Sequence, residues 1–498
     1  MTAPFTEILR LARSGSHERA WSLMAQHGLL DSDSDARALT LQARLVKDRA
    51  KRAAKGAEQA RLFDQSARIY AKAGHLSGES YPLINAASLS LFAGKAAQAE
   101  RFARQVLSMI DADPDEGETP YWREATRAEA LLVLGQEVEA RAALRRAIAI
   151  QPFAWEDHAA TLGQFALILA EKGLANRWLD AHRPPPSVHF SGIAGLAPDA
   201  RDVSHEIEDY ISKTQPGFAF GALAAGADLV FAEAFLAWRD AACPAAELHV
   251  VLPLPVDRFR QLSVAAFGDH WLGRFDTALE RATSLKVYGL DDPELSLAVE
   301  YADMVAMGRA VRRAQALQSR ACAVTVAIKG EELRPQLASW RESGFPLTII
   351  EGVRSGKVSN SAPAAPPNQK LQALVWARQA EPHASGNSGG PTENQRTYIE
   401  GRWSVYDDLV EAGLLAKELA HSAKDTQVAL TLVHCDPDGP DEPLLGRVAS
   451  LAAVAEPAMI VADEGTTMAL IQAGWNGPIE ELGELSLPSG REPIWSVA

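Results

Sequence analysis

The stretch from Val188 to Pro255 constrains the fold of this chain more than any other part of the sequence. It contains a short apolar run (VHFSGI), a polar helix, a Gly/Ala-rich turn that leads into an apolar helix (FAFGALAAGADLVFAEAFLAW), and another apolar run (ELHVVLPLP). Apolar strands joined through helices are typical of parallel sheets, which bind ligands where loops leave the strand ends. The order therefore predicts a strand–loop–helix–strand unit with a ligand site at its loops.

Two glycines, Gly221 and Gly226, flank the turn before a helix that we expect to begin near Asp228. Small residues there let backbone N–H groups approach an anion, and the N-terminus of a helix favours negative charge. A tight turn uses glycines in the same way, and Asp228 at a helix start can serve only as a cap. The pattern leaves both a phosphate site and a purely structural turn open.

The surrounding segment, residues 186–352, alternates strands with helices. Further strands are expected at 284–288, 322–328 and 347–350, and a long amphipathic helix at about 293–317. This alternation predicts a Rossmann-like α/β domain with a parallel, doubly wound sheet.

The N-terminal segment, residues 1–185, is rich in Ala, Leu, Arg and Glu, with apolar residues at helical spacing and glycines between the expected helices. Short helices joined by tight turns predict an all-α solenoid. One helical pair carries small and apolar residues at the spacing of a tetratricopeptide repeat: Ala128, Leu131, Ala140, Leu144, Ala147 and Pro152. The segment therefore resembles tetratricopeptide (TPR) repeats, which usually present a concave face to a protein partner. The alternative is that these helices only pack on the next domain.

Charge and cysteine content exclude several function classes. Across 498 residues the formal net charge is −15, which argues against broad binding of nucleic acid or anionic membranes. The three cysteines form no Cys-x-x-Cys pair, so neither a disulfide framework nor a zinc site is indicated. The N-terminus has no apolar core of a signal peptide and no stretch is long enough for a membrane span, so we expect a cytoplasmic protein.

The C-terminal part follows a Ser/Pro/Ala-rich stretch, residues 353–370, that reads as a flexible linker. Residues 371–498 then show a strand, a hairpin at 397–406, and alternating helices and strands up to a closing pair of strands. This order predicts an α+β domain. With the two preceding parts it makes a three-domain chain.

The loop F-G-A-L-A-A-G-A-D, followed by an apolar helix and by E-L-H-V-V-L-P-L, resembles the SLOG superfamily of Rossmann-like, nucleotide-sensing domains. A closer resemblance is to bacterial proteins that place such a domain between TPR repeats and a cyclase domain. The resemblance implies a nucleotide or nucleotide-derived ligand over the strand ends and no metal. The implied ligand-binding residues are Ser191, Gly192, Gly221, Gly226, Asp228, Glu233, Pro253 and Arg258. The glycine- and arginine-rich motifs of the hydrolytic branch are not present in this sequence.

The C-terminal order, with its ending LGELSLPSGREPIWSV, resembles class III nucleotidyl cyclase domains. Those enzymes need two carboxylates that hold two metal ions. The resemblance places Arg378 and Glu400 at the two carboxylate positions, and Gly446 and Ser450 where the transition state is stabilised. One carboxylate beside a cation does not make a two-metal site, so the resemblance implies a pseudocyclase, with a homodimer suggested by resemblance alone. An unrelated small α+β domain is the alternative.

Together these observations predict a non-catalytic signalling protein without catalytic residues. Its central domain binds a nucleotide-type ligand, and its repeats bind a protein of unknown identity. Two alternatives stay open: a pure interaction scaffold without ligand, and a residual nucleotidyl cyclase or nucleotide hydrolase.

Overall fold

The computed structural model describes residues 3–14, 17–113, 115, 117, 119–196, 200–288, 295–354, 370–378, 397–398, 401–422, 426–434, 439–456, 458–487 and 490–497. These residues form two compact units, Met1–Pro184 and Pro185–Ala498.

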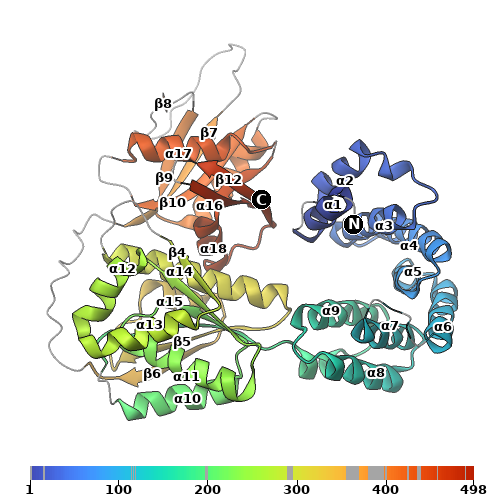
Figure 1. Cartoon of the computed structure of the whole chain (residues 1–498). Helices are drawn as coiled ribbons and strands as arrows, with labels where there is room; N and C mark the ends of the chain where they lie inside the picture. Colours follow the sequence, from blue (N-terminus) through green and yellow to red (C-terminus); the bar gives the residue numbers. More distant parts are fainter. Residues whose placement is uncertain are drawn as a thin grey trace. The chain divides into compact units, whose positions relative to one another are not determined.

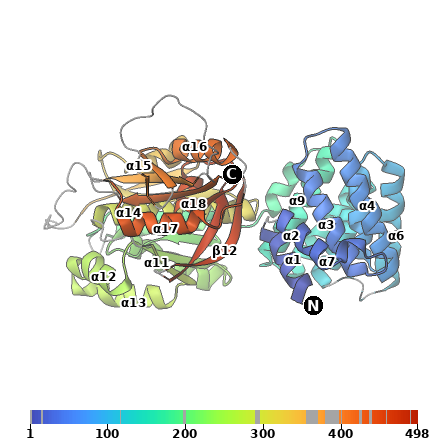
Figure 2. The ribbon, with the colours of Figure 1, turned by 90° about the horizontal axis from the view of Figure 1, so that it is seen from above.

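The first unit is built from antiparallel helices. They are α1 (Ala3–Ser14), α2 (His17–Gln26), α3 (Ala36–Arg52), α4 (Ala57–Ser77), α5 (Ser80–Phe92), α6 (Ala96–Ala112), α7 (Pro120–Val133), α8 (Glu137–Ile150) and α9 (Trp155–Glu171). Consecutive helices contact each other from α3 to α8, as stacked pairs in a solenoid do. Figure 1 labels each of these helices, and Figure 2 shows the same unit from above. Residues 175–182, expected as an α-helix, instead contain a 3₁₀ helix, Arg177–His182.

The small residues at helical spacing are what let these helices pair closely. Ala128 of α7 and Ala140 and Ala147 of α8 are all fully buried. A methyl side chain there lets the two backbones approach without leaving a void, since protein interiors are close-packed. The predicted helical solenoid is therefore confirmed in its architecture.

The second unit begins with a six-stranded sheet whose strands all run parallel. They are β1 (Ser187–Gly192), β2 (Phe218–Gly221), β3 (Glu247–Leu252), β4 (Ser284–Val287), β5 (Ala321–Ile328) and β6 (Leu347–Gly352), in the order β4-β3-β2-β1-β5-β6. Strand β1 pairs in parallel with both β2 and β5. The predicted α/β domain with a parallel sheet is confirmed.

Helices cover both faces of this sheet (Figure 1). The helices α10 (Arg201–Thr214), α11 (Ala227–Ala242) and α13 (Leu272–Glu280) bury apolar residues in one cluster with the strands. The long helix α14 (Leu295–Ala316) contacts β1, β2, β3 and β5. Two details differ from expectation. The helix expected after Val256 is a short α12 (Val256–Phe259) that continues as irregular helical turns, and α15 (Pro335–Glu342) is additional.

The same unit contains a second, mixed sheet. Its strands are β7 (Leu371–Arg378), β8 (Thr397–Tyr398), β9 (Gly401–Tyr406), β10 (Gln427–His434), β11 (Ile460–Asp463), β12 (Ile479–Leu487) and β13 (Gly490–Val497), in the order β12-β13-β11-β10-β7-β9-β8. Its helices are α16 (Leu409–Ser422), α17 (Glu442–Ala452) and α18 (Glu464–Gln472). Only β10 and β11 pair in parallel, and the β8–β9 and β12–β13 hairpins occur where the sequence predicts them.

The two sheets of the second unit are joined through α14, which packs against α18 (Figure 1). A Cβ on Gly308 of α14 would lie 1.9 Å from the carbonyl oxygen of Met468, and a Cβ on Gly465 would lie 1.9 Å from the Tyr301 hydroxyl. Only glycine allows the two helices to approach this closely.

Candidate functional site

The glycine loop between β2 and α11 is a site of very close backbone approach. Gly226 has a φ of 117°, and a Cβ there would lie 2.7 Å from the carbonyl oxygen of Ile193. A Cβ on Gly221 would lie 2.4 Å from the carbonyl oxygen of Phe190. The glycines therefore bring this loop against the end of β1.

The amides of this loop have acceptors within the protein. Ala224 N–H donates to Oδ2 of Asp228 at 3.2 Å, Ala225 N–H to the carbonyl of Ser263 at 2.9 Å, and Ala227 N–H to the carbonyl of Ile193 at 3.2 Å. Asp228 thus occupies the place at the start of α11 where an external anion was expected. An anion bound to these amides has to replace at least one of these contacts.

Of the other predicted residues, two lie beside the loop and three do not. Ser191 and Gly192 end β1 beside the loop, and the buried Ser191 hydroxyl lies 3.4 Å from that of Thr325 on β5. Glu233 is held in an ion pair with Arg274 of α13. The remaining two residues follow β3: Pro253 is buried, whereas Arg258 is exposed on α12. The structure brings together Ser191, Gly192, Gly221, Gly226 and Asp228.

A buried polar cluster, which the sequence did not reveal, faces these residues from α14 and α15. Asp303 of α14 is 6% exposed, forms an ion pair with Arg334, and accepts a hydrogen bond from Gln336 Nε2 at 3.2 Å. The second terminal nitrogen of Arg334, Nη2, is buried and has no hydrogen-bond partner among the described residues. The guanidinium therefore keeps donor capacity at this edge of the sheet.

The protonation of Asp228 is unusual for a carboxylate. Burial and, to a smaller extent, the nearby Asp303 raise its pKa to about 7, although Arg334 opposes the shift. His189 lies two residues before Ser191 on β1, and burial lowers its pKa to about 4. This edge of the sheet is therefore a region where charge is costly, except where Arg334 compensates it.

The strand order gives this edge a specific place in the fold. The chain proceeds from β1 through β2 and β3 to β4 on one side, and then continues with β5 and β6 on the other side of β1. The order therefore reverses between β1 and β5, where the loops after the two strands diverge. In parallel sheets such a reversal point opens a crevice outside the carboxyl ends of the strands.

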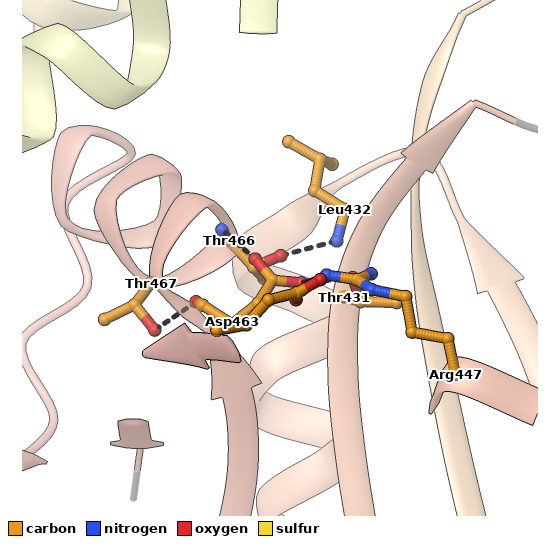
Figure 3. A network of polar contacts seen from close by, with 7 residues as sticks. Thr431, Leu432, Arg447, Asp463, Thr466 and Thr467 are labelled. Atoms are coloured by element: carbon orange, nitrogen blue, oxygen red, sulfur yellow. Dashed lines mark hydrogen bonds and ion pairs between the residues drawn. The ribbon is translucent and has the colours of Figure 1, made fainter. Parts of the chain in front are cut away.

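The second sheet contains its own polar network, which the sequence also did not reveal. Asp463 ends β11 and caps α18, and it accepts hydrogen bonds from Thr466 N–H at 2.8 Å and from the Thr431 hydroxyl at 2.6 Å (Figure 3). Arg447 of α17 donates to Asp463 at 3.3 Å and to Glu492 of β13 at 2.7 Å. This network links β10, β11, β13, α17 and α18.

The residues that the cyclase resemblance selects do not gather into a metal site within the described residues. Arg378 is exposed at the end of β7. Gly446 and Ser450 lie on α17, where the Ser450 hydroxyl donates to the carbonyl of Gly446 in its own helix. Glu400 lies outside the described residues.

Comparison with protein families places a match in the N-terminal unit. Residues 3–90, which cover α1 to α5, match the family model Tetratricopeptide Repeats-Sensor (TPR-S). The pair at 128–152, where the repeat spacing was clearest, lies outside that match. A search of curated proteins gave no match. Over the described ranges, no helix has the length and apolar character that a bilayer crossing requires. The N-terminal unit is thus a helical-repeat region similar to TPR-S, a type of repeat that generally mediates protein interactions.

Proposed function

We propose that this chain is a non-catalytic regulatory protein. In this proposal the parallel-sheet part binds a nucleotide or nucleotide-derived ligand at the β1–β5 edge, and the helical repeats bind a protein partner. The observation that carries the proposal is the reversal of strand order between β1 and β5, with Ser191, Asp228 and Arg334 gathered beside it. Ligands of open α/β sheets bind at such positions.

The contacts of Asp228 suggest how a phosphate would enter. A phosphate at the start of α11 would take over the Ala224 amide that Asp228 now accepts from, and the unused donor of Arg334 would neutralise part of its charge. Because the pKa of Asp228 is raised to about 7 by burial, its carboxyl can take up a proton when the anion arrives. A ligand would then replace an internal contact, without needing an empty site beforehand.

The test is isothermal titration of the full chain with ATP, ADP, GTP and cyclic AMP, compared between wild type and Arg334→Gln. At least one nucleotide should bind, and loss of the guanidinium should weaken it about tenfold or more, since charge-assisted bonds to phosphate are among the strong ones. Arg341→Gln is the matched control, because Arg341 is an exposed arginine on α15, outside the predicted site. Circular dichroism checks that both variants fold. Absence of binding by all four nucleotides would refute the proposal and favour the scaffold alternative.

Partner binding by the repeats has a separate test. Val138 of α8 is 77% exposed and Phe153, just after α8, is 46% exposed, so both are apolar side chains without cover in this unit. Proteins that copurify with the wild-type chain from its own cells should be lost with the double variant Val138→Asp, Phe153→Ser. Undiminished recovery of the same proteins would argue against this face as the docking surface.

We further propose that the second sheet is a cyclase-like domain without turnover. Support comes from its strand arrangement, in which β7 lies between β9 and β10 with hairpins at both ends of the sheet, and from the cation Arg378 at a position where the resemblance requires a carboxylate. Incubation with ATP or GTP and Mg²⁺ or Mn²⁺ should give no cyclic nucleotide. Product formation that Glu400→Ala abolishes would establish the enzyme alternative.

A further inference from the structure

A cavity of about 400 Å³ lies beside the C-terminal half of α14, with residues of the parallel sheet on one side and of α18 and β13 on the other. Its walls include the rings of Phe220, His249 and Trp495 and the guanidinium groups of Arg309, Arg312 and Arg313. Phe220 and His249 are stacked with ring centroids 4.6 Å apart. A volume of this size is in the range of small-molecule sites. The cavity therefore combines flat apolar surfaces with three cations from one helix.

The first and third of these arginines already have contacts that fix them. Arg309 donates to the Tyr288 hydroxyl at 3.0 Å and to Glu464 at 2.9 Å, and the guanidinium of Arg313 lies over the ring of Phe218. The acidic groups at the cavity are engaged as well, since Glu247 accepts from His249 at 2.9 Å. Glu464 and Glu247 are therefore both paired with groups other than Arg312.

Arg312 differs from its neighbours. Its guanidinium lies 4.4 Å from the centre of a Trp495 ring, but no hydrogen bond or ion pair involves it among the described residues. Burial lowers the pKa of Arg312, and the attraction of Glu481 offsets this only in part. No nitrogen of Arg312 is among the fully buried donors without a partner, so its five N–H groups can be reached from the cavity. An anion in the cavity would replace water there and accept charge-assisted hydrogen bonds from them.

We propose that this cavity binds a small organic phosphate that carries a planar heterocycle, of about the size of a nucleoside monophosphate. The phosphate accepts hydrogen bonds from Arg312, and the heterocycle packs among Phe220, His249 and Trp495. This site is distinct from the β1–β5 edge. Arg312 follows Asp303 by nine positions on α14, which is about 14 Å along a helix.

The position of the cavity gives its ligand a role in joining the two sheets. Phe220 and His249 come from the parallel sheet, whereas Trp495 comes from β13 of the mixed sheet. A ligand that contacts both sides favours the arrangement in which they are packed together. It therefore stabilises the second unit by an amount that grows with the logarithm of one plus the ratio of the free ligand concentration to Kd.

The experiment titrates the full chain with AMP, following heat and tryptophan fluorescence. Binding should be detectable below about 1 mM, Arg312→Gln should weaken it at least about tenfold, and Arg312→Lys, which keeps the charge but not the paired donors, should weaken it less. Arg320→Gln is the control, since Arg320 is exposed just after α14. Trp495→Phe should abolish the fluorescence change while AMP still binds.

The outcomes separate this site from the one at the β1–β5 edge. AMP binding that falls in Arg312→Gln but persists in Arg334→Gln supports the cavity, even if no nucleotide binds at the edge. Binding that persists unchanged in Arg312→Gln overturns the inference, as does a fluorescence change that survives in Trp495→Phe. Inorganic phosphate that binds as tightly as AMP overturns the part of the inference that concerns the ring. If Arg312→Gln does not fold, Arg312→Lys and Trp495→Phe decide the question.

Discussion

Two buried aspartates occupy comparable places in the two sheets of the second unit. Asp228 lies in the first turn of α11, shortly after β2, and Asp463 caps α18 directly after β11. They are almost equally buried, at 7% and 6% exposure. Asp463 accepts hydrogen bonds from an amide, a hydroxyl and a guanidinium. Asp228 is stabilised by two backbone amides, those of Ala224 and Gly192, and no side chain among the described residues donates to it.

Two aspartates near the start of a helix therefore differ in the number and kind of groups that donate hydrogen bonds to them. Asp463 joins an amide, a hydroxyl and a guanidinium from different elements, so its donors tie parts of the fold together. A buried carboxylate with few donors is costly to keep charged, in agreement with the raised pKa of Asp228. Loss of Asp463 should therefore disturb the fold more than loss of the Asp228 charge.

The largest effect should follow Asp463→Ala. Its removal leaves Thr431, Arg447 and the amide of Thr466 without their shared acceptor, and breaking a buried pair costs about 3–5 kcal/mol. Urea denaturation measures the loss. Asp441→Ala is the control, because Asp441 caps α17 at an exposed position through one bond to Leu444 N–H and should cost about 1 kcal/mol. Equal losses in the two variants would remove the distinction between a network and a simple cap.

Asp228→Asn should instead raise the free energy of unfolding, and the size of this gain should depend on pH. Burial raises the folded-state pKa of Asp228 from 3.8 to about 7, so the folded state binds more protons between these values, and its stability falls as the pH rises through this window. Asparagine keeps an acceptor for Ala224 but cannot ionise. The variant should match the wild type near pH 4 and exceed it above pH 7 by about 1–4 kcal/mol, at about 1.4 kcal/mol for each pKa unit.

Thermal or urea unfolding between pH 4 and pH 8 measures this dependence. The other titratable or charged groups at the same edge are Asp303, Arg334 and His189. Asp441→Asn, at an exposed position, is the comparison variant measured in the same way. A parallel pH dependence of Asp228→Asn and the wild type would mean that Asp228 remains charged in the fold.

The smallest effect is expected for Thr431→Val, which removes one donor of the Asp463 network and leaves two. The Thr431 hydroxyl is fully buried and lies 2.6 Å from Asp463, so its loss should cost about 1–2 kcal/mol. Ser450→Ala, which removes an exposed hydroxyl bonded only within α17, should be close to neutral. If Thr431→Val costs as much as Asp463→Ala, the three donors act as a single unit whose effects do not add.

Local pattern was sufficient to predict most helices and strands, because hydrophobic periodicity and Gly or Pro punctuation act within a few residues. The strands expected at 322–328 and 347–350 and the helix expected at about 293–317 have bounds within two residues of β5, β6 and α14. The short α15 was missed because its eight residues carry too little periodicity. The irregular helical turns after Val256 were predicted as one helix because the sequence shows no break there.

The polar clusters could not be predicted in the same way. The Asp463 network joins residues from Thr431 to Glu492, and Asp303 meets Arg334 from another element, so both depend on tertiary packing. The glycines of the loop did predict close backbone approach, although the partner in this structure is the backbone after β1. Arg312 reads in sequence as part of an ordinary polar helix face. One local signal was available: Asp463 precedes a helix at the edge of an apolar strand, as capping residues do.

Gly308 packs directly against the backbone of Met468, and this contact matters when the chain is divided into fragments. Residues 353–370 look like a natural place to cut, yet a fragment that ended there would leave one side of α14 bare to water. A fragment that began there would expose the matching side of α18. Both halves should then be prone to aggregation, and the intact second unit should melt in one cooperative transition rather than two.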